Sequence, residues 1–163
     1  MSKKAIQIYI SLDQQLLSVL QEGVVTKSYK VSTAKNGPGE LLNSECTPRG
    51  HHIIRAKIGD QADINTIFVG RRATGERYSP ALRQQYPDRD WILTRILWLS
   101  GCEPGVNRLG NVDTMRRYIY IHGCPDEDEM GIPNSHGCIK MRNNDVIELF
   151  DIVEAGTPVY IKE

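Results

Sequence analysis

The sequence has 163 residues, of which 40% are hydrophobic and 25% are charged, as is typical of a globular chain long enough to bury a core. Its 20 basic residues balance its 20 acidic residues, which removes the usual electrostatic reason to expect nucleic acid or an anionic membrane as a partner. We therefore expect one domain over residues 1–163 that binds neither nucleic acid nor a membrane. The sequence does not indicate an oligomeric state.

The N-terminus starts like a signal peptide but does not continue as one. Lys3 and Lys4 precede an apolar run that polar residues 13–15 interrupt, and no small-residue cleavage site follows. Without an export signal we expect a cytoplasmic protein with free thiols, or a periplasmic one if a leader was removed. The cysteines are Cys46, Cys102, Cys124 and Cys138.

Alternating or β-branched runs predict a mainly β fold. A polar, Gly/Pro-rich stretch over residues 33–50 separates the first strands from the rest. In the run RRYIYIHG, Tyr118 and Tyr120 are expected on one face, with Ile119 and Ile121 on the other. The predicted strands cover residues 5–11, 16–23, 24–33, 51–59, 65–70, 91–101, 116–123 and 157–163.

Two short helices are expected among these strands. Ser79 and Pro80 are typical of an N-cap and a first turn, and they predict a helix that ends near Pro87. A second helix is predicted in NNDVIELFDIVEAG, capped by Asn143 or Asn144, with its apolar stripe at residues 146–153 and its end at Gly156.

The tripeptide His-Gly-Cys occurs twice, at residues 122–124 and 136–138. Two His-x-Cys pairs could supply four zinc ligands, because residues two apart in an extended segment face the same way. Structural zinc sites, however, usually contain Cys-x₂₋₄-Cys pairs. The spacing therefore makes zinc the weaker alternative, and we expect no metal or cofactor.

A thiol enzyme requires only one cysteine and one histidine to lie close together, whereas the zinc site requires four ligands. His122 ends a predicted strand, and Cys138 follows a glycine just before the second helix. An imidazole within reach of a thiol can lower the pKa of the thiol and later protonate a leaving group. The residues alone do not exclude a buried, inert cysteine beside a packed histidine.

The stretch HGCPDEDEMGIPNSHGCIKMRNNDVIELFDIVEAGTPVYI resembles the signature of the L,D-transpeptidase (YkuD-like) family, in which an upstream histidine precedes Ser/Thr-His-Gly-Cys. STAKNGPGE, TPRGHHIIRAKIG and FVGRRATGE are also similar to parts of that catalytic domain. The resemblance covers nearly the whole chain. It implies a β-sandwich or closed β-sheet domain with a few short helices.

Carried over to this chain, the resemblance makes Cys138 the nucleophile and His122 the general base, oriented by the carbonyl of Gly123. Ser135, His136 and Gly137 complete the motif, with His136 shaping the site instead of taking the proton. The N–H groups of Gly137 and Cys138 are the expected oxyanion donors.

The implied substrate is a murein tetrapeptide, cut between the L-centre of diaminopimelate and the terminal D-alanine. Its carboxylates call for a basic pocket. The family commonly has Arg or Asn where this chain has Lys140, so that any planar contact to a carboxylate would be weakened here. The candidate substrate-binding residues are Lys140, Arg142, Arg72, Arg95, Arg116, Arg117 and Tyr120.

Three functions remain open at this point. The expected location favours a cytoplasmic L,D-carboxypeptidase that acts on recycled murein peptides. The alternatives are a periplasmic L,D-transpeptidase that forms 3→3 cross-links and a zinc-bound murein-binding module without catalysis. We also hypothesise that oxidation joins Cys124 to Cys138 and switches the enzyme off.

Overall fold

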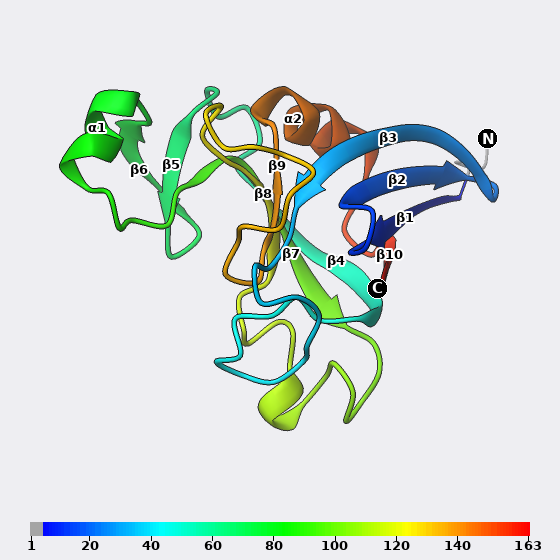
Figure 1. Cartoon of the computed structure of the whole chain (residues 1–163). Coiled ribbons are helices and arrows are strands. Elements are labelled where there is room, and N and C mark those ends of the chain that lie inside the picture. The colour runs from blue at the N-terminus through cyan, green and yellow to red at the C-terminus, as the bar shows by residue number, and fades with distance from the viewer. Residues whose placement is uncertain (1–4) are drawn as a thin grey trace.

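The computed structural model describes residues 5–163, in which ten strands form one sheet (Figure 1). The strands are β1 (Ile6–Ser11), β2 (Leu16–Gln21), β3 (Val24–Ser32), β4 (Gly50–Ile58), β5 (Thr66–Val69), β6 (Arg72–Arg77), β7 (Ile92–Gly101), β8 (Tyr120–Gly123), β9 (Ile139–Met141) and β10 (Pro158–Lys162). The helices are α1 (Pro80–Gln85), α2 (Asn143–Ile152) and a 3₁₀ turn, Gly110–Val112.

The sheet closes on itself through its longest strand. The order is β4-β10-β1-β2-β3-β9-β8-β7-β5-β6, and β7 also pairs with β4. The strands from β4 round to β7 therefore form a ring, which removes the exposed edges of an open sheet. The β5–β6 hairpin and α1 extend from this ring, on the opposite side of Figure 1 from the hairpins near the N-terminus. The expected mainly β, closed-sheet fold is confirmed.

Alternating side chains of these strands fill the ring. Val159 and Ile161 in β10 are 1% exposed, whereas Tyr160 between them is 36% exposed. Helix α2 adds Val146, Leu149 and Phe150 to the same apolar core. This core fixes the inner faces of β8 and β9, so their other faces are available for a site.

Several local expectations need correction. The predicted strand 116–123 begins only at Tyr120, because a turn occupies the preceding residues and Tyr118 has a φ of 56°. Tyr118 is exposed and Tyr120 is buried, so the two do not form one strand face. Strands β6 and β9 were not expected. The first is entirely exposed and polar, and the second has only three residues.

The helix signals were partly correct. Ser79 caps α1 as predicted, since its Oγ accepts the Leu82 N–H at 3.2 Å. Helix α2 has Arg142 at the N-cap position instead of an asparagine, and it ends before Gly156. Within residues 5–163, no helix is both long enough and apolar enough to cross a membrane.

Candidate active site

Strands β8 and β9 run parallel, with His122 beside Lys140 and Ile121 beside Ile139. Because side chains alternate along each strand, the isoleucines enter the core while His122 and Lys140 face the opposite way. Cys138 comes just before β9 and faces the same way as Lys140. The parallel register therefore places Cys138 and His122 as diagonal neighbours on one face.

That face borders a cavity of about 530 Å³, within the range of small-molecule and peptide-end sites. Seven residues singled out from the sequence line it: His122, Cys138, Ser135, His136, Lys140, Arg117 and Tyr120. The lining also includes residues that sequence reasoning missed, namely Gly70, Arg71, Asp90, Ile92, Tyr118 and Ile119.

His122 is buried and held in one tautomer. Its Nδ1 lies 2.6 Å from the Gly123 carbonyl oxygen, which can only accept, so Nδ1 carries the proton and Nε2 has the free lone pair. Burial lowers the pKa of His122, while the charge of Asp90 and the bond to Gly123 act in the other direction. The imidazole is therefore neutral near pH 7, as a general base must be.

A buried polar network fixes Gly123. A side chain there would collide with the carbonyl oxygen of Leu93 and with Oδ1 of Asn143, since a Cβ would lie 2.6 and 2.4 Å from them. Asn143 donates to the Cys124 carbonyl oxygen at 2.9 Å and accepts from the Thr94 hydroxyl at 2.6 Å. Thr94 has a φ of 75°, a strained value for a β-branched residue, at a register shift in β7.

The Cys138 thiol lies just before the start of β9, against the backbone of residues 118–120. The Tyr120 N–H donates to Sγ at 3.3 Å, and Sγ is 3.4 Å from the Tyr118 carbonyl oxygen. Burial raises the pKa of Cys138 to about 12, although the Tyr120 N–H and the Arg117 charge favour the thiolate. The resting sulfur is therefore a thiol, which needs a base in order to attack.

Residues 135–138 form a braced turn. The Ser135 hydroxyl donates to the Cys138 carbonyl oxygen at 2.6 Å and accepts the Gly137 N–H at 3.2 Å. Gly137 has a φ of +131°, and a Cβ there would lie 3.2 Å from the Cys46 carbonyl oxygen. This corrects the expectation for Gly137, because its N–H is already engaged by Ser135 and is not free for an oxyanion.

Two of the expected cationic residues line the cavity, and they differ in whether a carboxylate already pairs with them. Lys140 forms an ion pair with Asp128 at 2.7 Å and donates to Asn134 Oδ1 at 2.9 Å. Arg117 is half-buried and donates to the Cys46 carbonyl oxygen at 2.7 Å, and within residues 5–163 no carboxylate lies within ion-pair distance of it. Arg117 is therefore the better placed of the two to receive an anion.

The other expected arginines lie outside the cavity lining. Arg95 is 7% exposed and donates to the carbonyl oxygens of Ala62 and Thr94, both at 2.7 Å. Arg142 is at the start of α2, and Arg72 is exposed in β6. Arg116 lines a different hollow. For Arg72 and Arg95 the sequence position could not reveal this, because the faces of β6 and β7 depend on distant pairing.

Arg71 and Asp90 line the cavity, although neither was expected from the sequence. Arg71 donates to the Tyr120 hydroxyl at 3.0 Å, and its guanidinium lies over the Trp98 and Tyr118 rings at 4.7 and 4.8 Å. Burial dominates the pKa shifts of both His122 and Cys138; the charge of Asp90 opposes the lowering at His122 and adds to the raising at Cys138. No sequence signal separates Arg71 from Arg72 or Asp90 from Asp88.

The structure argues against a role for Cys124 at the reactive centre. Its Sγ donates to the Met141 carbonyl oxygen at 3.3 Å, and burial raises its pKa to about 12. In the β8–β9 register Cys124 and Cys138 are four residues apart along the strands, or about 13 Å, whereas a disulfide needs a Cα separation below about 7 Å. The hypothesis of a Cys124–Cys138 disulfide is therefore wrong.

The zinc alternative lacks a ligand set. Among residues 5–163, no three His, Cys, Asp or Glu side chains are arranged to hold a metal ion. His136 is exposed at the cavity, while Cys124 is buried and bonded to the backbone, so the two His-Gly-Cys pairs do not converge.

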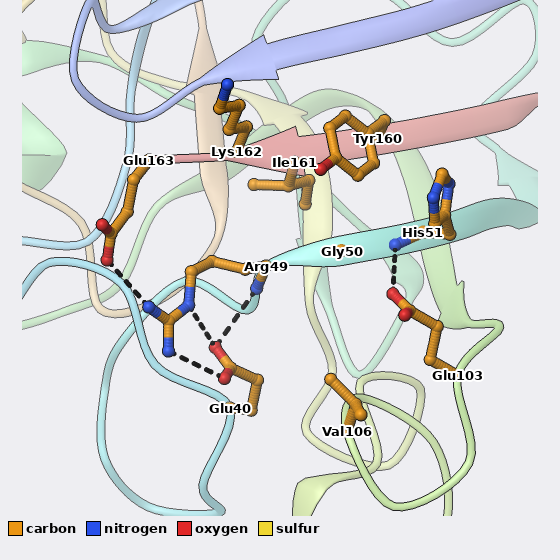
Figure 2. A pocket seen from close by; sticks show the side chains of 10 residues that line it. All are labelled: Glu40, Arg49, Gly50, His51, Glu103, Val106, Tyr160, Ile161, Lys162 and Glu163. Atoms are coloured by element: carbon orange, nitrogen blue, oxygen red, sulfur yellow. Dashed lines mark hydrogen bonds and ion pairs between the residues drawn. The ribbon is translucent and has the colours of Figure 1, made fainter.

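A second cavity, of about 500 Å³, lies beside β4 and β10 (Figure 2). Arg49 there pairs with Glu40 at 3.0 Å and Glu163 at 2.8 Å, and Glu103 accepts the His51 N–H. Its charges thus largely satisfy one another, and no cysteine lines it. The cavity with Cys138 and His122 is the better candidate for chemistry.

Comparison with known proteins shows the family of the whole chain. A family model described as the L,D-transpeptidase catalytic domain (YkuD) matches residues 5–161. No curated protein matches the sequence. Similar solved structures include an L,D-transpeptidase from Mycobacterium smegmatis, with 18% identity, a TM-score of 0.60, and coverage of 98% of this chain and 59% of that one.

Two further structures show the same fold. L,D-transpeptidase 3 from Mycobacterium tuberculosis, in complex with a faropenem-derived adduct, has 17% identity and a TM-score of 0.60, and the match covers 98% and 61% of the two chains. An Enterococcus faecium L,D-transpeptidase has 18% identity and a TM-score of 0.58, with coverage of 98% and 50%. This chain thus spans less than two thirds of each of them. With the family model matching nearly its whole length, the chain belongs to the L,D-transpeptidase catalytic domain family.

Proposed function

We propose that the protein is a cysteine acyl-enzyme peptidase that removes the terminal D-alanine from murein tetrapeptides, at the bond after the L-centre of diaminopimelate. One observation carries the proposal. Cys138 faces the same cavity as His122, whose Nδ1–H is fixed on the Gly123 carbonyl oxygen, so that Nε2 is left to take a proton.

The reaction follows from the protonation states of these two residues. As Sγ of Cys138 attacks the carbonyl carbon, His122 Nε2 takes the thiol proton. Collapse of the tetrahedral intermediate breaks the C–N bond, and His122 gives its proton to the departing amine of D-alanine. Water, deprotonated by His122, then hydrolyses the thioester and restores the thiol. The Cys138 N–H remains the expected oxyanion donor.

Arg117 is the proposed site for the terminal carboxylate of the leaving group. Its half-buried guanidinium has donors directed at neutral backbone carbonyls and no carboxylate partner within residues 5–163. Its charge also acts on Cys138, so it lies close to the reacting atoms. A planar guanidinium matches a carboxylate better than an ammonium does.

Water as the acceptor, and the cytoplasm as the location, belong to the proposal as well. All four cysteines are free thiols, and one of them is exposed, which suits a reducing compartment. In such a compartment the available substrates are soluble murein fragments instead of polymerised wall. The similar structures named L,D-transpeptidases favour the second candidate function, transfer to an amine with formation of 3→3 cross-links.

Incubation with purified tetrapeptide, with and without an amine acceptor, decides between these functions. We expect tripeptide and free D-alanine by mass spectrometry, with little cross-linked product even when the acceptor is in excess. Predominant cross-linked product would establish the transpeptidase instead. A peptide left intact by the wild type, with no acyl adduct on Cys138, would refute both enzymatic functions.

A further inference from the structure

One end of the active-site cavity has two opposite charges that do not pair with each other. Arg71 follows the end of β5, and Asp90 precedes β7. Phe68 pairs with Ile92 in the antiparallel β5–β7 ladder, and continuing that register brings Gly70 opposite Asp90. Arg71 and Asp90 therefore lie at neighbouring strand ends, and both residues line the cavity.

Arg71 is held as a rigid cation. It lies over the rings of Trp98 and Tyr118 and donates one hydrogen bond to the Tyr120 hydroxyl, which leaves most of its five N–H donors uncommitted. No ion pair joins it to any carboxylate in the described part of the chain. Because the guanidinium is already held in place, it loses little further conformational freedom when it binds an anion.

Asp90 complements it with a free negative charge. Within residues 5–163, Asp90 forms no ion pair with lysine or arginine, although it lines the cavity. The other acidic group near the reactive strands, Asp128, is already bound by Lys140 and Arg83 at 2.7 Å each. Asp90 is thus the carboxylate that remains available to an incoming cation.

We infer that this end of the cavity binds a zwitterionic amino-acid head group, with its carboxylate on Arg71 and its ammonium on Asp90. The inference rests on the proposed function, in which the group is the D-centre at the end of the diaminopimelate side chain. That side chain branches from the residue whose carbonyl Cys138 attacks, so its end can reach a second region of the same cavity. The enzyme would then select diaminopimelate over lysine at the third position.

Binding measured without turnover tests the proposed contact between Arg71 and the carboxylate of the head group. In Cys138→Ala, calorimetry compares tetrapeptides with diaminopimelate, its side-chain amide, or lysine at position three. We expect diaminopimelate to bind about 10- to 100-fold more tightly than either other peptide, the range for a hydrogen bond to a charged group. Adding Arg71→Ala or Arg71→Gln should abolish the preference, whereas adding the exposed neighbour Arg72→Ala should preserve it.

The proposed contact between Asp90 and the ammonium of the head group is tested separately, with Asp88 as the matched control. Acetylation of the D-centre amine should weaken binding to Cys138→Ala by about tenfold or more. Adding Asp90→Asn should remove that difference, and adding Asp88→Asn, at an exposed position outside the cavity, should retain it.

Equal binding of the diaminopimelate and lysine peptides would overturn the inference, as would a preference that survives both Arg71 variants. These outcomes are separable from failure of the proposed function. Wild-type turnover of tetrapeptide with no preference at position three refutes only the head-group site. A preference of the expected size without any turnover supports the head-group site and refutes the peptidase.

Discussion

At the scale of single residues, the Cys138 sulfur is the proposed attacking atom. Cys138→Ala should abolish turnover, because a methyl group cannot form the thioester. It should leave the fold intact, because within residues 5–163 the thiol is hydrogen-bonded to backbone groups and to no other side chain. Product release by mass spectrometry and the thermal unfolding midpoint measure the two effects. A variant that still cleaves tetrapeptide would remove Cys138 from the mechanism.

The two histidines at the cavity differ in what they can do. His122 is buried with a fixed tautomer, whereas His136 is exposed. His122→Ala should lower kcat by about 10²–10⁴-fold, the usual contribution of a general acid–base. His136→Ala should cost less, since it alters only the cavity wall. Steady-state kinetics at several pH values would contradict the assignment if His136→Ala were the more impaired enzyme throughout.

The pH dependence should reveal the buried base. Desolvation lowers the pKa of His122 below its ordinary value of 6.5, and a base acts in its neutral form. Lowering the pH therefore inactivates the free enzyme only when it passes through this depressed pKa, so the acid limb of kcat/KM should have its midpoint below 6.5. A midpoint above 6.5 would mean that a carboxylate controls His122 more strongly than burial does.

At the scale of elements, the junction of β7, β8 and α2 positions His122, the proposed base. Asn143 ties the Cys124 carbonyl oxygen to the Thr94 hydroxyl beside Gly123. Asn143→Ala leaves both groups buried without this partner, so we expect a loss of about 1–3 kcal/mol in unfolding free energy and a lower kcat. Asn144→Ala, at the exposed next position, is the matched control, and equal effects in urea unfolding and kinetics would refute the network's role.

At the scale of the whole molecule, β10 closes the ring between β1 and β4. Ile161 faces the core and Tyr160 faces outward. Ile161→Ala should therefore cost about 2–5 kcal/mol of unfolding free energy, as for a buried isoleucine, while Tyr160→Ala should cost clearly less. Urea titrations of both variants check this, and a smaller loss for Ile161→Ala would show that the ring does not depend on its last strand.

The sequence by itself determined the parts whose signals are local. Alternation predicted most strands because the side-chain period of two reports burial directly, and the Ser79-Pro80 pair predicted the start of α1. The spacing and flanking glycines of His122 and Cys138, together with the family resemblance, identified the two residues that the cavity brings together. Alternation failed at Tyr118, where a positive φ ends the run before β8 begins.

Only the tertiary structure decided what surrounds these two residues. Pairing of β8 with β9 set a register that separates Cys124 from Cys138 and makes Cys138 and His122 diagonal neighbours. The β5–β7 pairing brought Arg71 and Asp90 to the cavity while their neighbours Arg72 and Asp88 remained outside it. The physical reason is that residues of like charge one or two positions apart are equivalent in an unfolded chain. They become different only when strands distant in sequence pair and fix which side chain faces inward.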